Sequence, residues 1–289
     1  MLNHNVFQKL AIILMGMLNR PSGRIGLLLV GVHILLAILS PLIVPFDFAV
    51  MDFNLVMTAP SGTHWFGADA LGRDVLTRTM LGGRQALLVT CFSAIIAVFW
   101  GGLSGLFLGL VGGRIDDILM RIVDAFMSIP WILFLLLIVA VVGTGPMVLI
   151  PTFGFFYGIP VIRIARAATH DVVARDFITA ARARGEKRLT ILQKELFPNI
   201  LDVLLVEGAM RWSWMLLAFS SLSFLGFGVT PPTPDWGLMI SDSRSIMSIA
   251  PWTALAPVVA LSSLIIGLNL CADSLAKALG VDRAQKVPV

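Results

Sequence analysis

Glu207 and Arg211 are opposite charges in a stretch of sequence that is otherwise mostly apolar. Four residues is about one turn of a helix, so the two side chains can pair and lower each other's cost of leaving water. Ionisable groups within a membrane are the default place to look for transport chemistry. A substrate or proton pathway that includes Glu207, Arg211 and Trp214 is therefore one interpretation. A buried pair that only stabilises the bundle is the other, and we favour it.

Two more polar residues interrupt apolar stretches. Asp124 is expected to dock against Arg121 or another helix, and His33 is expected to be a hydrogen-bonded core residue and not a metal ligand. An ion-coupled secondary transporter that uses Glu207, Arg211 and Asp124 is the alternative function that these charges allow.

The sequence lacks the common short catalytic motifs. No lysine follows a glycine, so the Gly-Lys-Ser/Thr of a phosphate-binding loop is absent and ATP cannot be hydrolysed by that route. There is also no His-Glu-x-x-His, Gly-x-Ser-x-Gly or Cys-x-x-Cys, and the four histidines are scattered. We expect no enzyme activity and no cofactor or metal bound by this chain, with Cys91 and Cys271 as free buried thiols.

Composition indicates an integral membrane protein. Hydrophobic residues make up 57% of the chain, charged residues only 13%, and the mean hydropathy is +0.91. Since a helical span needs about 20 apolar residues, the chain is predicted to be all-α with six transmembrane helices. Their expected ranges are 25–44, 86–111, 129–142, 146–162, 203–227 and 250–271. The third is short, and it can extend backward through 118–127 if Asp124 faces protein.

The distribution of positive charge predicts the orientation. With the N-terminus inside, sixteen of the 21 Lys and Arg residues fall in inner segments, and among these are Arg283 and Lys286 near the C-terminus. Both termini are therefore expected in the cytoplasm. The net charge of +4 reflects topology and contact with anionic membrane lipid, and needs no nucleic-acid partner. Residues 10–18 are expected to form an interfacial helix and not a signal peptide.

The longest polar interval lies between the fourth and fifth predicted spans. Residues 165–184 are expected to be largely helical, Gly185 to end that helix, and a second helix over 186–197 to end before Pro198. Ala180, Ala181 and Gly185 would leave one face of this helix-turn-helix bare, so that another protein could approach closely. The surrounding basic residues could fix an acidic partner surface, although any inner loop is basic.

The order of residues in this interval resembles a known motif. Thr179-Ala180-Ala181, then Gly185, then Pro198 is similar to the EAA loop of ABC importer permeases, with Thr179 where the family has Glu and Phe197 where it has Leu.

Four further segments narrow the resemblance to the dipeptide, oligopeptide and nickel branch of these permeases. They are 64–78, 112–124, 223–228 and 231–237.

The resemblance implies a type I ABC importer permease-like fold and a role in peptide import at the inner membrane of a bacterium. It also implies several partners: a second homologous permease, two ABC ATPase subunits that bind ATP and Mg, and an extracytoplasmic substrate-binding protein. The ATPase-coupling residues would be Asp176, Thr179, Ala180, Ala181, Arg184, Gly185, Pro198 and Asn199.

The expected organisation has five parts. They are a cytoplasmic N-terminal segment (1–24), a first transmembrane helix (25–44), an extracytoplasmic loop (45–85), a permease core with its cytoplasmic coupling loop (86–275, loop 163–200) and a cytoplasmic tail (276–289).

Overall fold

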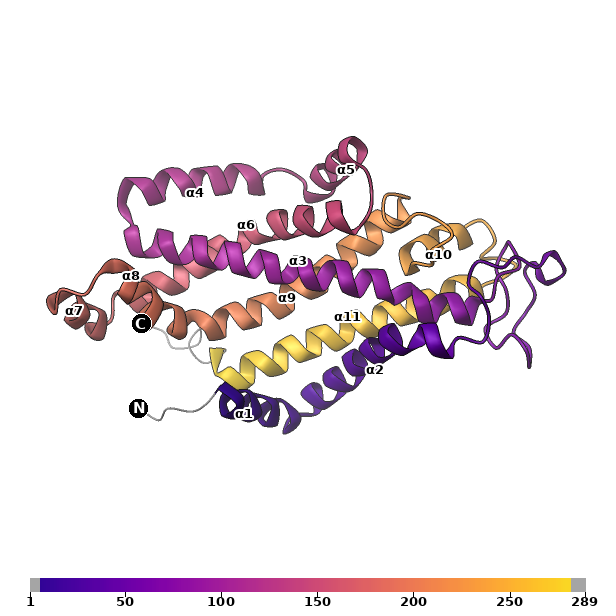
Figure 1. Cartoon of the computed structure of the whole chain (residues 1–289), viewed down its shortest axis with the longest axis horizontal. Helices are drawn as coiled ribbons and strands as arrows, with labels where there is room; N and C mark the ends of the chain where they lie inside the picture. Colours follow the sequence, from indigo (N-terminus) through magenta and orange to yellow (C-terminus); the bar gives the residue numbers. More distant parts are fainter. Residues whose placement is uncertain (1–5, 282–289) are drawn as a thin grey trace.

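The computed structural model describes residues 6–281 and shows an elongated bundle of helices (Figure 1). The segments expected at 1–5 and 282–289, with Arg283 and Lys286, lie outside the described residues. Residues 6–281 contain no β-strand, only an isolated bridge between Ala68 and Asp74. The helices are α1 (Val6–Leu18), α2 (Pro21–Ile43), α3 (Val75–Val111), α4 (Gly113–Met127), α5 (Trp131–Val142), α6 (Pro146–Val173), α7 (Asp176–Ala183), α8 (Arg188–Ile191), α9 (Phe197–Phe224), α10 (Trp236–Ser243) and α11 (Trp252–Leu279).

Four of these helices are long and apolar enough to cross a membrane: α2, α3, α6 and α11. The pair α4 and α5 adds a fifth candidate, bent by 79°. Helix α9 has 28 residues but falls outside this set by composition. The all-helical, membrane-spanning fold is thus confirmed, with four or five apolar spans among the described residues.

Helix α5 covers most of the third expected range, 129–142, but the possible extension through 118–127 does not join it in one continuous helix. Helix α4 ends at Met127, and Pro130 precedes α5. Proline has no N–H to donate to the preceding turn, and its ring clashes with the carbonyl four residues back, so the helix breaks there.

Helix α3 begins at Val75, eleven residues before the expected start at Ala86. Asp74 caps its N-terminus by accepting a hydrogen bond of 2.7 Å from the backbone N–H of Thr77. The sequence predicts a loop for these charged first turns, but they are helical, and Arg78 within them is only 1% exposed.

Helices α3 and α6 pack along a line of glycines at four-residue spacing. A Cβ added to Gly101 would lie 2.4 Å from the Gly158 carbonyl oxygen, and one added to Gly105 would lie 2.5 Å from that of Ile162. Gly109 meets Thr169 in the same way. Small residues let helix backbones approach closely in a membrane, so this pair forms the centre of the bundle.

Helix α2 lies against α11, where His33 bridges the two. Its Nδ1 is 2.8 Å from the Leu29 carbonyl oxygen, and its Nε2 is 3.0 Å from that of Ala260. The prediction of a hydrogen-bonded core histidine is confirmed. Cys91 and Cys271 are free, as expected, and each is partly buried.

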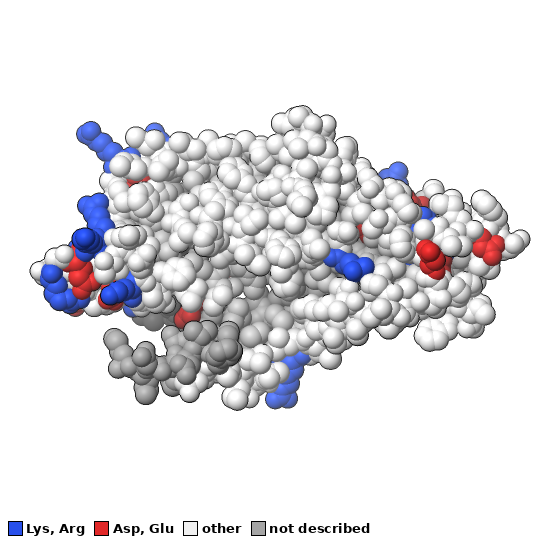
Figure 2. Space-filling model, viewed as in Figure 1, with Lys and Arg blue, Asp and Glu red and all other residues white. Residues whose placement is uncertain are grey.

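Charged side chains gather at the two ends of the bundle and leave its middle largely uncharged on the face shown in Figure 2. One end carries α7 and α8, and we call it the hairpin end. The other carries segments 44–74 and 225–251, and we call it the loop end (Figure 1).

Candidate functional site

The hairpin, residues 174–199, projects beyond the bundle between α6 and α9 (Figure 1). Residues 165–184 are largely helical as expected, with a break at residues 174 and 175 that separates α6 from α7. The short α8 leads through a π-helical stretch, Leu192–Leu196, into α9. The second arm of the hairpin is therefore continuous with α9, whereas the first is joined to α6 through a two-residue break.

Gly185 ends α7, as its position in the sequence predicted. Its φ of +77° lies in the left-handed region that favours glycine. Its N–H donates to the Arg182 carbonyl at 3.0 Å, and the Glu186 N–H donates to the Ala181 carbonyl at 3.2 Å. These two bonds are those of a Schellman motif, which satisfies the last carbonyls of a helix.

The expected helix end before Pro198 is wrong, because the helix continues through this residue. Pro198 is the second residue of α9 and follows directly on the π-helical stretch, so it lies within a continuous run of helix. The Phe197 N–H bonds the Leu192 carbonyl, five residues back, and the Asn199 side-chain amide donates to the Glu195 carbonyl at 2.6 Å. The π-helical turn and Asn199 together accommodate the proline without a break.

One face of the hairpin is buried against the bundle. Ile178, Ala181, Ile191 and Leu196 are each at most 1% exposed and form one apolar cluster with residues of α3, α6 and α9: Leu106, Val161, Ala165, Val172, Ile200 and Leu204. Ala181 therefore does not lie on a bare outer face, and the expectation that it shares such a face with Ala180 and Gly185 is corrected. Its small size serves packing within the chain.

The opposite face is exposed and carries most of the predicted coupling residues. Asp176, Thr179, Ala180, Arg184, Gly185, Pro198 and Asn199 are all exposed. Arg184 donates to Glu186 at 2.7 and 3.0 Å, which fixes its guanidinium beside the turn. The hairpin end thus presents small exposed residues, and Figure 2 shows charged side chains gathered at this end.

Two large apolar side chains on this surface were missed by the sequence reasoning. Leu189 is 63% exposed and Phe177 is 37% exposed. Apolar residues surrounded by charge are typical of protein interfaces. Helix α8 has only four residues, which is too short to show an amphipathic pattern. No pattern in the sequence therefore singles out Leu189.

The predicted pair in α9 forms: Arg211 Nε donates to the Glu207 carboxylate, and Glu207 is only 8% exposed. Trp214 is 59% exposed, so it does not share the burial of the pair. Asp124 lies 3.8 Å from Arg163 of α6, but both side chains are more than half exposed, so this is a loose surface pair and the expected docking of Asp124 against another helix stays a prediction. Each of these carboxylates thus has a partner within the chain, and no group of three or more metal-ligating side chains occurs among residues 6–281.

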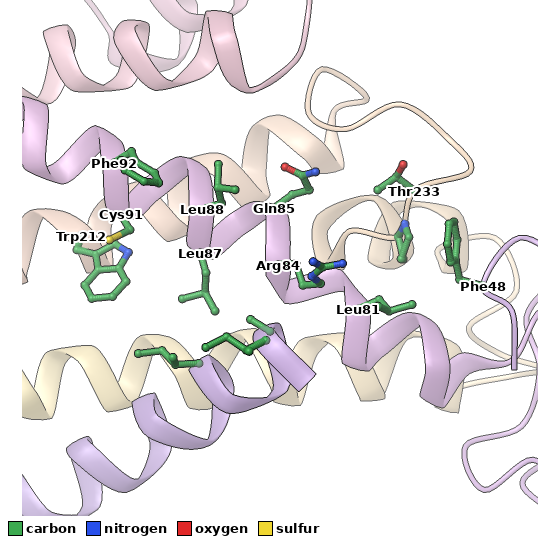
Figure 3. Close-up of a pocket in the computed structure, with 14 residues that line it drawn as sticks. Phe48, Leu81, Arg84, Gln85, Leu87, Leu88, Cys91, Phe92, Trp212 and Thr233 are labelled. Carbon is green, nitrogen blue, oxygen red and sulfur yellow. The ribbon is translucent and has the colours of Figure 1, made fainter. Parts of the chain in front are cut away.

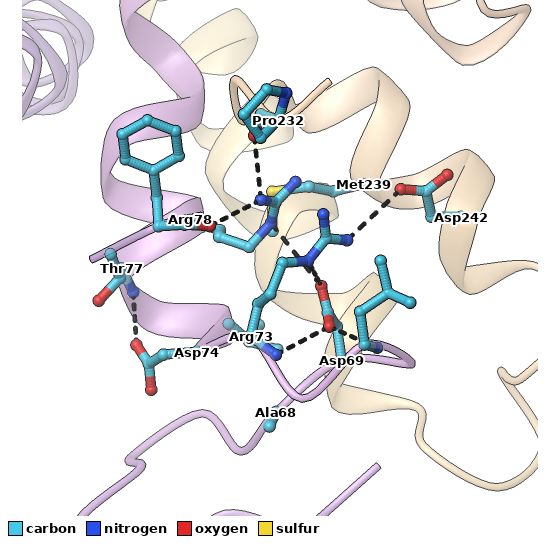
Figure 4. Close-up of polar contacts among 12 residues, drawn as sticks. Ala68, Asp69, Arg73, Asp74, Thr77, Arg78, Pro232, Met239 and Asp242 are labelled. Atoms are coloured by element: carbon cyan, nitrogen blue, oxygen red, sulfur yellow. Dashed lines mark hydrogen bonds and ion pairs between the residues drawn. The ribbon is translucent and has the colours of Figure 1, made fainter. Parts of the chain in front are cut away.

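At the loop end, a second set of charged residues joins segments far apart in the sequence (Figure 4). Arg73 donates to Asp69 at 2.7 Å and lies 3.9 Å from Asp242 of α10. The buried Arg78 donates to the backbone carbonyls of Phe48 and Pro232 at 3.0 and 3.2 Å. Burial raises the pKa of Asp242, and the guanidinium groups of Arg73 and Arg78 oppose that shift.

The sequence does not predict this set of contacts. The segments 64–78 and 231–237 are separate motifs, and no local pattern in either indicates that they are in contact. Their contact joins the two loops through Arg78, because a buried guanidinium needs several acceptors at once.

The all-helical fold with several apolar spans agrees with what comparison with known proteins finds. Residues 101–282 match the family described as "Binding-protein-dependent transport system inner membrane component". The chain belongs to this family, which is one of bacterial inner-membrane transport permeases and not of enzymes.

Its relatives place it in the dipeptide and oligopeptide branch. It is 34% identical to the dipeptide transport system permease protein of Alkalihalophilus pseudofirmus, over 88% of this chain and 84% of the relative. It is 33% identical to the oligopeptide transport system permease protein of Haemophilus influenzae, over 88% and 82%. It is also 33% identical to the glutathione transport system permease protein of Pectobacterium atrosepticum, over 89% and 85%.

Proposed function

We propose that this chain is one transmembrane subunit of an ATP-driven importer of peptides. The relatives named above are permeases of dipeptide, oligopeptide and glutathione transport systems. A second homologous permease, two ABC ATPase subunits and an extracytoplasmic substrate-binding protein complete the assembly, and ATP and Mg bind to the ATPases.

Within this assembly the chain spans the membrane six times, through α2, α3, the bent α4–α5 pair, α6, α9 and α11. Helix α9 is the sixth span because the Glu207–Arg211 pair neutralises its charges inside the bundle. The hairpin end and both termini face the cytoplasm, since the basic residues gather there. The loop end faces outward, toward the binding protein, and α1 lies at the inner interface.

The exposed face of the hairpin is the coupling surface. Ala180 and Gly185 let an ATPase approach closely, Asp176, Thr179 and Arg184 supply polar contacts, and Leu189 is the apolar anchor. Pro198 and Asn199 hold the joint between the hairpin and α9. The observation that carries this assignment is that the surface lies directly above the buried cluster around Ile178.

The buried cluster around Ile178 is the route by which movement of the hairpin reaches the helices of the bundle. Closure of the ATPases on ATP displaces the hairpin, and its close-packed inner face moves α3, α6 and α9 with it because such a cluster cannot be compressed. A central cavity between the two permeases then alternates between outward-open and inward-open. This chain contributes movement and a pathway, and no chemistry.

The test is peptide uptake by the assembled transporter in proteoliposomes. Uptake that requires ATP and survives an ionophore is the expected result. Uptake that collapses with the ionophore and ignores ATP would instead assign transport to Glu207, Arg211 and Asp124.

A further inference from the structure

A groove of about 550 Å³ opens on the side of the bundle near the loop end (Figure 3). Its walls come from α2, α3, α9 and both loop-end segments. Most of the lining is apolar, with Ile34, Ile38, Phe48, Leu88 and Phe92 among the residues. Pockets of this size and character accept small organic molecules.

Arg84 is the only charged side chain among the residues that line this groove. It is exposed, and within residues 6–281 it has no hydrogen-bond or ion-pair partner on its side chain. The other arginines of the loop-end part of α3 and its preceding turn, Arg73 and Arg78, are both paired and buried. Arg84 is thus a free guanidinium set in an apolar wall.

Two neutral polar groups lie beside it. Gln85 and Thr233 line the same groove, and Figure 3 shows the Gln85 amide and the Thr233 side chain on the same side of the groove as the Arg84 head group. Guanidinium, amide and hydroxyl groups are all donors to a carboxylate.

The position of Arg84 along α3 places this part of the groove near one end of the membrane span. From Arg84 to the end of α3 is about 40 Å of helix at 1.5 Å per residue, which exceeds the roughly 30 Å of hydrocarbon. Arg84 therefore lies near the outer boundary, where a solute enters. A guanidinium at this boundary stays hydrated and accessible to an anionic solute, while the carbon stem of the side chain lies along the apolar wall.

We propose that Arg84, with Gln85 and Thr233, binds the carboxylate of the transported solute at the outer part of the pathway. The inference rests on the proposed function, because a peptide always carries a C-terminal carboxylate unless it is blocked. The apolar lining accommodates the peptide's side chain, and the guanidinium distinguishes a free acid from a neutral analogue.

The test compares uptake of alanyl-leucine and alanyl-leucinamide by the assembled transporter, with its binding protein, in proteoliposomes. Arg84→Gln is expected to lower uptake of the acid about tenfold and to leave uptake of the amide unchanged, as loss of one charge-assisted hydrogen-bonded contact requires. Arg84→Lys retains the charge but not the planar set of donors of a guanidinium. Its uptake of the acid is expected to lie between that of the wild type and that of Arg84→Gln. Any preference of the binding protein itself cancels, because the same binding protein is used with every variant.

Arg244→Gln is the matched control, since Arg244 is an exposed arginine of the same end that does not line the groove. The ratio of alanyl-leucine uptake to alanyl-leucinamide uptake in Arg244→Gln should equal the ratio in the wild type. An unchanged ratio in Arg84→Gln, including an equal fall for both probes, overturns the inference. So does loss of the assembled complex in this variant, which assigns Arg84 to packing against the second permease. A wild-type transporter that moves neither probe overturns the proposed function first, before any variant is compared.

Discussion

Arg166 of α6 donates two hydrogen bonds, each of 2.5 Å, to the two carboxylate oxygens of Asp116 in α4. Asp116 is 3% exposed, and His170 lies 3.8 Å from the same carboxylate. The contact fixes α4 beside α6 although the two helices share few other polar contacts. It is the bidentate geometry for which arginine is better suited than lysine.

We expect Asp116→Ala to lower the free energy of unfolding by about 2 kcal/mol, because it removes one partner of a mostly buried pair. Arg166→Lys should lower the free energy of unfolding by less than Asp116→Ala does. It should still lower it by more than a substitution at an exposed position does. Thermal unfolding in detergent measures both, and a double-mutant cycle isolates the pair. A coupling energy near zero would contradict this role for the contact.

Gly185→Asp should abolish transport while membrane insertion and folding persist. A Cβ at Gly185 meets nothing within 4 Å in this chain, so the new side chain projects outward into the proposed ATPase contact. Left-handed φ costs about 1 kcal/mol in a residue other than glycine.

Gly280→Asp is the matched control for that cost. Gly280 also ends a helix, has a φ of +75° and has open space around its Cβ position. Uptake should persist in Gly280→Asp. Equal loss of uptake in the two variants would show that backbone strain, and not the coupling surface, is responsible.

Leu189→Ala should weaken recovery of the ATPase subunits with the purified permease and leave the thermal stability of the chain nearly unchanged. The side chain is 63% exposed, so little burial within the chain is lost, whereas truncating an interface anchor costs about 2 kcal/mol of binding. Leu42→Ala, at an 83% exposed position of α2, is the control and should retain the ATPases. Full ATPase recovery with Leu189→Ala would remove this residue from the coupling surface.

The sequence predicted local features of this molecule better than distant contacts. The stop at Gly185 and the pairing of Glu207 with Arg211 depend on neighbours within a turn or two, and both are observed. The contact between Arg166 and Asp116 spans 50 residues, and that between Arg78 and Pro232 spans 154. Such contacts follow from tertiary packing, which charge and hydropathy patterns do not encode.

The errors have the same cause. The local preference of proline predicts that a helix ends before Pro198, but the π-helical turn that precedes this residue allows the helix to continue through it. The small size of alanine predicts that Ala181 lies on a bare outer face. In the structure it is buried, because it packs in the same cluster as Ile191 and Leu196. In both cases the tertiary environment overrides the local rule.

Gly105→Val should prevent stable folding, because a side chain there would enter the contact between α3 and α6. Its Cβ would lie 2.5 Å from the Ile162 carbonyl oxygen and 2.6 Å from the Ala165 Cβ. Overpacking of this kind costs about 1–3 kcal/mol and more against backbone. Gly31→Val, in α2 with nothing within 4 Å, is the control and should fold normally. Equal yields of folded protein from the two variants would contradict the close approach of α3 and α6.

Asp235 offers a test of pH dependence at the loop end. Its side chain caps α10 by accepting from the N–H groups of Gly237 and Leu238 at 2.9 and 3.2 Å, and it is 1% exposed. Burial raises the pKa of this carboxyl, while Ser223 and the two backbone N–H groups pull it the other way. A raised pKa means that the folded state holds the proton more tightly, so this group's contribution to stability falls as pH rises from the unfolded pKa through the folded one.

Asp235→Asn keeps the cap, since asparagine is an equally good capping residue, and it removes the ionisation. We expect the variant to be at least as stable as the wild type at neutral pH and to lose this part of the pH dependence. Asp235→Ala loses the cap and should be less stable by about 1 kcal/mol. Unfolding of the purified chain followed between pH 4 and pH 8 measures all three proteins. A wild-type stability that rises more steeply with pH than that of Asp235→Asn would mean that the N–H groups and Ser223 outweigh burial at this site.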